Sequence, residues 1–139
     1  MSKKKYSKSL SNKINFLIVE DMNVQRDLII KDLEKLGIVG TIYQAKSLEE
    51  AHKLCEEKIQ FILADWILPD GTGYDLLLTI KKNKKLKNLP FIIFTTIEQV
   101  EPMIMAIKAG ADEFIVKPWT SDELKEKVHF AWDKHHTEA

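Results

Sequence analysis

The chain has 139 residues, and its 21 basic and 21 acidic side chains give a formal net charge of zero. With 45% apolar and 30% charged residues, its composition is typical of one globular domain and excludes a disordered chain. No apolar run reaches the roughly 20 residues of a membrane span, and the single cysteine, Cys55, excludes an internal disulfide and favours a reducing cytoplasm. We expect a flexible basic tail over 1–13 and one domain over 14–139.

The first two predicted strands are each followed by a helix. A strand over 14–19 precedes a helix that Asn23 caps and that ends at Leu36. Val24, Leu28, Leu33 and Leu36 lie near helical spacing and are expected on its inner face. A second strand over 38–45 precedes a helix that opens with the capping-box pattern of residues 47–50.

The third predicted strand, residues 61–65, is an apolar run that ends on an acid, Asp65. Such a run between turn formers is typical of a buried strand in a parallel sheet. Gly71 and Gly73 allow a tight turn after it. The next helix is then expected to begin near Tyr74, with Leu77 and Leu78 on the same face.

The remaining elements complete a regular alternation. A fourth strand over 91–94 leads to a helix that starts at Pro102 and ends before Gly110. A fifth strand over 112–116 leads to a last helix, which opens with the capping-box pattern of residues 120–123. Five strand–helix alternations predict a doubly wound α/β domain, with a parallel sheet and helices on both of its faces.

Polar residues stand at the carboxyl ends of four predicted strands. These ends lie on one edge of a parallel sheet, where such folds bind ligands. Three carboxylates would repel one another unless a cation joins them, and hard oxygen ligands suit Mg²⁺. An aspartate can act as a nucleophile toward phosphorus while a lysine neutralises the transferring group. The residues concerned are Glu20, Asp21, Asp65, Thr95 and Lys117.

Four segments carry a resemblance to a known family. They are FLIVED (16–21), ILADWILPDGTG (62–73), FIIFTT (91–96) and GADEFIVKPW (110–119). In order and spacing they resemble a response regulator receiver domain over about 14–132. The resemblance implies a five-stranded flavodoxin-like (βα)5 fold with strand order 2-1-3-4-5. Trp66 adds some similarity to the single-domain regulators of chemotaxis.

The resemblance also implies roles in two-component signalling for the strand-end residues. Asp65 would accept a phosphoryl group from a sensor histidine kinase. Glu20, Asp21 and Asp65, with the backbone carbonyl of Ile67, would hold Mg²⁺. Such a protein would be cytoplasmic, would act through protein contacts without binding nucleic acid or inserting into a membrane, and would be a monomer or a phosphorylation-dependent dimer.

A conformational switch is implied as well. Lys117 would pair with the phosphoryl group and Thr95 would turn toward it, which is a shift between two populations. The switch aromatic of the family falls on Phe114, which lacks the hydroxyl of a tyrosine and cannot report by hydrogen bonding. The downstream target would bind the face of the fourth helix, fifth strand and fifth helix, residues 102–132. Candidates on that face are Lys108, Phe114, Trp119 and Lys125.

Two apolar residues flank the expected phosphoryl site. Ile67 lies two residues after Asp65, and Ile97 lies two residues after Thr95. Neither side chain can orient a water molecule by hydrogen bonding. We therefore predict an aspartyl phosphate that hydrolyses slowly.

Three alternatives remain open beside a stand-alone receiver domain. The chain can be a receiver domain excised from a larger regulator or hybrid kinase. It can be a Mg²⁺-dependent phosphatase, although such an enzyme needs a general acid where Ile67 stands. It can be a flavin-binding module, although Glu20 and Asp21 occupy the place of its phosphate loop. The four histidines form no metal-ligand pattern and are expected on helix surfaces and in the tail.

Overall fold

The computed structural model describes residues 10–136. Five parallel strands form its sheet: β1 (Phe16–Val19), β2 (Ile42–Ala45), β3 (Phe61–Asp65), β6 (Phe91–Thr95) and β7 (Glu113–Val116). Their order in the sheet is β2-β1-β3-β6-β7. Counted among these five strands alone, this is the order 2-1-3-4-5, so the predicted doubly wound, flavodoxin-like fold is confirmed.

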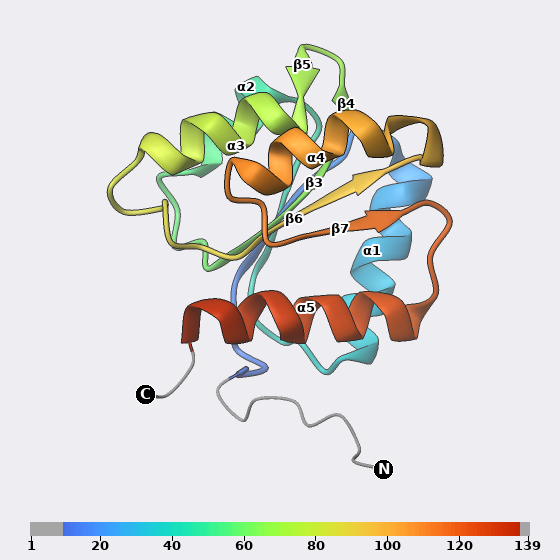
Figure 1. Ribbon diagram of the computed structural model, residues 1–139. Coiled ribbons are helices and arrows are strands. Elements are labelled where there is room, and N and C mark those ends of the chain that lie inside the picture. The colour runs from blue at the N-terminus through green and yellow to red at the C-terminus, as the bar shows by residue number, and fades with distance from the viewer. Residues whose placement is uncertain (1–9, 137–139) are drawn as a thin grey trace.

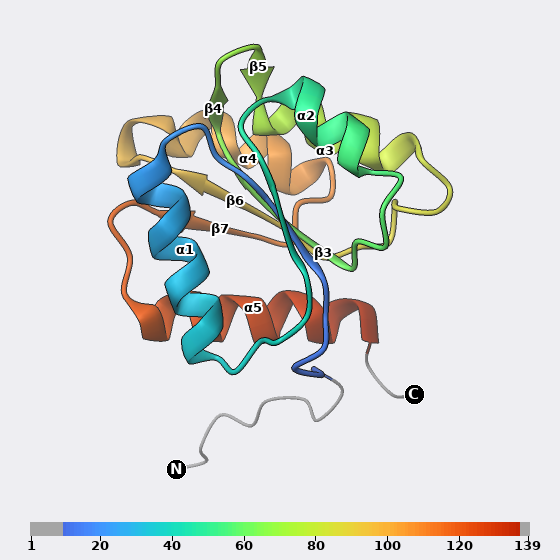
Figure 2. The ribbon, with the colours of Figure 1, turned by 180° about the vertical axis from the view of Figure 1, so that it is seen from behind.

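Helices cover both faces of the sheet (Figures 1 and 2). They are α1 (Asn23–Lys35), α2 (Leu48–Leu54), α3 (Gly73–Lys82), α4 (Val100–Lys108) and α5 (Ser121–His136). Helices α2, α3 and α4 lie on one face, and α1 and α5 on the other. Within the described residues, no helix is both long enough and apolar enough to cross a membrane.

The alternation of side chains along the central strands produces two cores. Phe61 and Leu63 point to the core beneath α1 and α5, whereas Ile62 and Ala64 point to the core beneath α2, α3 and α4. Because both faces are covered, β3 reads as a continuous apolar run, and each residue from Phe61 to Ala64 is fully buried.

Several local expectations are wrong. Asn23 is the first residue of α1; the N-cap position belongs to Met22, which makes no side-chain cap. Val24 and Leu28 are 71% and 48% exposed, so neither lies on the inner face of α1. Leu33 is buried as predicted, and the other residues that this helix buries are Arg26, Ile29 and Asp32.

The third and fourth helices also differ from expectation. Leu78 is exposed, and α3 instead buries Leu76, Leu77 and Ile80. Helix α4 begins at Val100, and a 3₁₀ turn, η1 (Ile97–Gln99), precedes it, so Pro102 occupies the third helical position and not the first. A small antiparallel hairpin, β4 (Ile67–Leu68) with β5 (Gly71–Thr72), follows β3 and was not predicted.

The caps of α2 and α5 agree with their capping-box patterns. The Ser47 hydroxyl accepts a hydrogen bond from the Glu50 N–H at 3.1 Å, and Thr120 accepts one from the Glu123 N–H at 3.1 Å. Thr72 and Asp75 form a third capping box, at the start of α3, which was not predicted. These caps fix where the loops at the carboxyl edge of the sheet turn into helices.

Candidate functional site

Asp65 ends β3 at the carboxyl edge of the sheet. The residue is 8% exposed, and its Oδ1 lies 2.5 Å from Nζ of Lys117, which follows β7. Burial raises the pKa of the Asp65 carboxyl above its ordinary value, although the hydrogen bond and the charge of Lys117 act in the opposite direction. The fold thus joins two residues that are 52 positions apart into one buried ion pair.

Glu20 follows β1 and is the most deeply buried acid of the site, at 1% exposure. Its Oε1 lies 3.6 Å from Nζ of Lys117, and its Oε2 accepts the N–H of Met22 at 3.1 Å. Burial raises its pKa from 4.5 to about 7, with a further contribution from the charge of Asp65. Its bond to Met22 and the charge of Lys117 oppose this rise without cancelling it.

The three predicted carboxylates meet. Glu20, Asp21 and Asp65 each place an oxygen within 4.8 Å of the other two, and Asp21 is the exposed member. Within residues 10–136, the Lys117 ammonium is the cationic group that pairs with the buried Glu20 Oε1 and Asp65 Oδ1. One ammonium group therefore faces three acids. These residues fit a hard divalent cation such as Mg²⁺, because it prefers oxygen ligands and tolerates retained water.

Thr95 ends β6 beside Asp65, since Phe94 is the register partner of Asp65 in the neighbouring strand. Thr95 is 1% exposed, and its hydroxyl lies 3.1 Å from Oε1 of Gln99 and 3.3 Å from the carbonyl oxygen of Thr96. In the part of the chain that the structure describes, no hydrogen bond joins this hydroxyl to Asp65. Thr95 stands at the site, but its hydroxyl is engaged elsewhere.

Arg26 supports the first acidic loop and was not predicted. Its side chain donates to the backbone carbonyl of Glu20 at 2.9 Å, to Gln44 Oε1 at 2.9 Å and to Asn23 Oδ1 at 2.6 Å. These bonds hold the end of β1 against α1. The available signal was its spacing from Ile29 and Leu33, which puts the arginine on the buried face of the helix.

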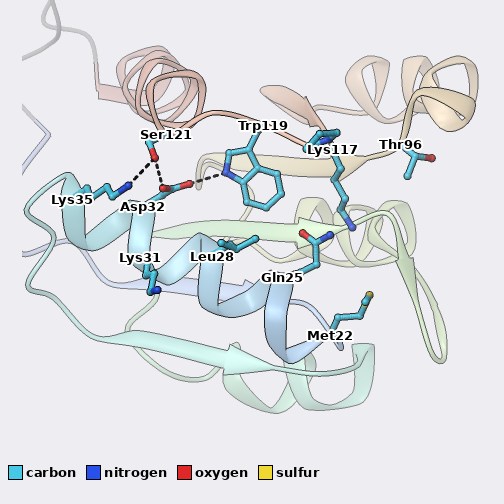
Figure 3. Close-up of a pocket in the computed structure, with 11 residues that line it drawn as sticks. Met22, Gln25, Leu28, Lys31, Asp32, Lys35, Thr96, Lys117, Trp119 and Ser121 are labelled. Atoms are coloured by element: carbon cyan, nitrogen blue, oxygen red, sulfur yellow. Dashed lines mark hydrogen bonds between the residues drawn. The ribbon is translucent and has the colours of Figure 1, made fainter.

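A second unpredicted network holds the loop that carries Lys117. Asp32 on α1 accepts the Trp119 indole N–H at 2.7 Å and the Ser121 hydroxyl at 2.6 Å. Figure 3 shows this network at one end of a groove of about 590 Å³, with Met22, Lys117 and Thr96 toward the other end. The loop after β7 is thereby tied to α1.

The loop after Asp65 is shaped by two short polar contacts and one glycine. Gly73 packs so closely that a Cβ there would lie 2.5 Å from the Asp65 carbonyl oxygen. The Asp70 carboxylate accepts the N–H groups of Leu48 and Glu49 at the start of α2, and these bonds lower its pKa. Ile67, two residues after Asp65, is 57% exposed in the β4–β5 hairpin.

The residues expected to transmit a signal lie on α4, β7 and α5. Phe114 is half-buried, and the Lys127 ammonium lies 5.2 Å from its ring centroid while bonding its carbonyl oxygen at 2.7 Å. Lys108 and Lys125 are exposed. The Trp119 ring packs edge-on against the buried Phe94, with ring centroids 4.8 Å apart, so the side chain contributes to the packing of the interior.

The histidines and Cys55 take no part in this site. His135 lies in α5 and contacts Asp112 at 2.9 Å, and His136 stacks on the Trp132 ring, so neither is a tail residue. Burial raises the pKa of the Cys55 thiol, and its side chain packs against the core, as expected for a structural cysteine.

Comparison with known proteins places this arrangement in a family. The family model of the response regulator receiver domain matches residues 16–129. The chain is 31% identical to the chemotaxis protein CheY of Pseudomonas aeruginosa over 121 residues, which cover 87% of this chain and 98% of that protein. It is 34% identical to the chemotaxis protein CheY-3 of Vibrio cholerae, over 86% of this chain and 92% of that protein.

Solved structures show the same fold. A response regulator receiver domain protein from Clostridium thermocellum superimposes with a TM-score of 0.77 at 27% identity, covering 87% of this chain and 95% of that chain. The signal receiver domain of a histidine kinase from Syntrophus aciditrophicus gives a TM-score of 0.75 at 25% identity, covering 90% and 95%. The likeness therefore extends over nearly the whole of each relative.

Proposed function

The chain belongs to the family of response regulator receiver domains, and we propose that Asp65 is the phosphoacceptor through which it is controlled. The observation that carries this proposal is the buried Asp65–Lys117 pair, at 2.5 Å, within a cluster of three carboxylates. In the part of the chain that the structure describes, Asp65 shares its one cationic partner with a second buried acid, which is a costly arrangement for a purely structural residue. The alternatives of a phosphatase or a flavin module are not favoured by this family membership.

The chemistry that follows is transfer between two nucleophiles. A carboxylate oxygen of Asp65 forms a bond to phosphorus as the bond from phosphorus to the histidine nitrogen of the kinase breaks, and the imidazole leaves with the electron pair of that bond. Lys117 already lies beside the attacking carboxylate and neutralises charge on the phosphoryl oxygens. Mg²⁺ bound by Glu20, Asp21, Asp65 and the Ile67 carbonyl would supply further positive charge there. Apart from its own phosphorylation and dephosphorylation, we propose no catalysis.

The response is a change of conformation around Thr95. Its hydroxyl turns from Gln99 toward the phosphoryl group, and the half-buried Phe114 ring repacks. The output surface is then the face of α4, β7 and α5, where Ile104 and Met105 are more than half exposed. We propose that a downstream protein binds this face and that the chain acts as a monomer or a phosphorylation-dependent dimer.

The setting follows from two-component signalling. The partner upstream is a sensor histidine kinase, and we propose a cytoplasmic location without direct contact with nucleic acid. The domain boundary at residue 14 stays a prediction. Of the basic segment 1–13, residues 1–9 lie outside the described residues, whereas Leu10 packs on the core and the carbonyl oxygen of Asn12 accepts the N–H of Val39 at 2.7 Å.

The phosphoryl group is expected to last. Ile67 and Ile97 are 57% and 73% exposed beside the site, and neither can orient water for attack. Loss of phosphate from the purified protein, followed by intact mass, should take minutes or longer. A half-life of seconds would contradict this part of the proposal.

The direct test of the function uses acetyl phosphate as donor. Intact mass after incubation with Mg²⁺ should show the addition of one phosphoryl group to the wild type, and chelation of the Mg²⁺ should suppress it. Asp65→Asn should show none, and a variant with a distant exposed acid replaced, Glu34→Gln, should behave as wild type. Wild type without a mass gain, or Asp65→Asn with an undiminished one, would overturn the proposal.

A further inference from the structure

The Gln99 side chain bridges the switch residue Thr95 and the start of α4. Its Oε1 lies 3.1 Å from the Thr95 hydroxyl and 3.2 Å from the Thr96 backbone nitrogen. The backbone N–H of Gln99 donates to the Thr96 carbonyl oxygen at 3.1 Å. Gln99 therefore closes the η1 turn and reaches back to the last residue of β6 at the same time.

The chemistry of these contacts fixes which group donates. The Thr96 N–H can only donate, so the Gln99 atom that faces it must be the amide oxygen. The Thr95 hydroxyl has one hydrogen and two acceptors in reach, this oxygen at 3.1 Å and the Thr96 carbonyl oxygen at 3.3 Å, and the Gln99 oxygen is the nearer. A phosphoryl oxygen also accepts hydrogen bonds and cannot donate them when ionised. The Thr95 hydroxyl thus cannot serve Gln99 and a phosphoryl group on Asp65 at once.

We infer that Gln99 is a positioning residue that holds Thr95 away from Asp65 until phosphorylation and passes its release to α4. The inference rests on the proposed function, because it needs a phosphoryl group on Asp65 as the competing acceptor. Phosphorylation removes the Thr95 hydrogen bond from Gln99. The amide oxygen then keeps only the Thr96 N–H, which weakens the contact between β6 and η1.

Because of the position of Gln99, loss of its hydrogen bond to Thr95 affects the output surface. The Val100 N–H donates to the Ile97 carbonyl oxygen, so η1 runs directly into the first turn of α4. Gln99 is therefore the link between the end of β6 and the helix whose Ile104 and Met105 are exposed. Gln99 thus provides a hydrogen-bonded connection between the site and the output surface. Phe114 cannot provide one, because its side chain has no hydroxyl.

A double-mutant cycle tests the competition. Beryllium fluoride with Mg²⁺ serves as the probe, since it mimics a phosphoryl group on a carboxylate, and the fluorescence of Trp66 beside Asp65 reports its binding. Gln99→Met keeps the length of the side chain but removes the acceptor. We expect it to tighten binding about fivefold, which is the effect of one neutral hydrogen bond. In a Thr95→Val background, which keeps the shape but removes the hydroxyl, the same substitution should change binding less than about twofold.

Two further variants separate this role from a structural one. Gln99→Glu offers a charged acceptor, so it should weaken binding by more in the wild-type background than in the Thr95→Val background. Glu98→Gln, on the same turn but without a bond to Thr95, should have equal effects in both. A merely structural Gln99 would give equal effects of Gln99→Met in both backgrounds, and that result would overturn the inference while leaving the proposed function intact. Wild type that does not bind the probe through Asp65 would overturn the proposed function itself.

Discussion

Asp65 and Asp112 are each 8% exposed. Asp65 lies at the carboxyl edge of the sheet, where the parallel strands end, and Asp112 lies at the opposite edge, where they begin. Asp112, before β7, is satisfied: one oxygen accepts the Phe91 N–H at 2.8 Å, and the other contacts His135 at 2.9 Å and Lys134 at 3.4 Å. Asp65 has the Lys117 ammonium but shares it with Glu20 and lies beside a third acid. Two equally buried aspartates thus have opposite surroundings.

This difference in charge compensation distinguishes a carboxylate that stabilises the fold from one that is suited to a reaction. At Asp112 two cationic or titratable groups and a backbone donor serve one acid, so the burial of its charge is compensated. At Asp65 three acids compete for one cation, so the folded chain alone does not compensate them. Only a bound cation or an added proton relieves that edge.

Replacing Asp112 should damage the fold and leave phosphorylation in place. Asp112→Ala removes the hydrogen-bond acceptor of the Phe91 N–H and the acidic partner of Lys134 and His135. We therefore expect a loss of about 4 kcal/mol in the free energy of unfolding. Asp65→Ala removes repulsion and should stabilise the protein at neutral pH. Urea unfolding of both variants measures this contrast. If Asp112→Ala lowered the free energy of unfolding by less than about 1 kcal/mol, the structural role of Asp112 would be contradicted.

The acidic edge should make stability depend on pH in a direction unusual for a carboxylate. Glu20 has a pKa of about 7 when folded and 4.5 as its reference value. The unfolded chain therefore releases this proton first, and stability falls as pH rises from about 4.5 to about 7, by on the order of 3 kcal/mol. Mg²⁺ held by the deprotonated acids would offset the fall.

Thermal unfolding at several pH values, with and without Mg²⁺, checks this dependence. Glu20→Gln should flatten the pH profile and remove most of the stabilisation by Mg²⁺. If Mg²⁺ stabilised the wild type equally at pH 5 and pH 8, the assignment of these acids as its ligands would be contradicted.

Gly73→Ala should disturb the site through its backbone. The new Cβ would meet the Asp65 carbonyl oxygen at 2.5 Å, so either the β3 end or the α3 start must shift, at a cost of about 2 kcal/mol. Phosphorylation by acetyl phosphate should slow in parallel. Gly37→Ala is the matched control, because its φ of +86° strains alanine but nothing lies within 4 Å of the added carbon. It should lower stability by about 1 kcal/mol and leave the phosphorylation rate unchanged.

The smallest effect concerns the lifetime of the phosphoryl group. Ile67→Asn introduces an amide that can orient water, and we expect hydrolysis to accelerate about tenfold, which corresponds to ~1.4 kcal/mol. Leu78→Asn, an equally polar change on an exposed part of α3, should leave the rate unchanged. Equal rates for wild type and Ile67→Asn would show that the apolar side chain does not protect the phosphoryl group.

The strands were predictable because burial on both faces leaves an apolar run in the sequence. Phe61–Ala64 and Phe91–Phe94 are such runs, and the ends of parallel strands necessarily meet, so Glu20, Asp65 and Lys117 could be grouped before the structure was known. The resemblance to the family then gave each of them an expected role.

The errors on α1 arose where a polar residue occupies a buried position. Arg26 and Asp32 lie on the inner face of α1, so the apolar Val24 and Leu28 were wrongly placed there. Their burial is compensated in part by hydrogen bonds with Gln44, Trp119 and Ser121, which are distant in the sequence. The spacing of apolar residues along one helix does not reveal such distant partners. The same holds for Gln99, whose contact with Thr95 depends on the turn between them.

The position of the phosphoryl group on the chain decides whether Asp65 is the phosphoacceptor. The protein is phosphorylated with acetyl phosphate and Mg²⁺, digested at acid pH where acyl phosphates survive better, and analysed by tandem mass spectrometry. We predict modification of Asp65, with Asp21 and Asp112 unmodified in the same sample. A phosphoryl group on Asp112, or on any residue of the acidic edge other than Asp65, would contradict it.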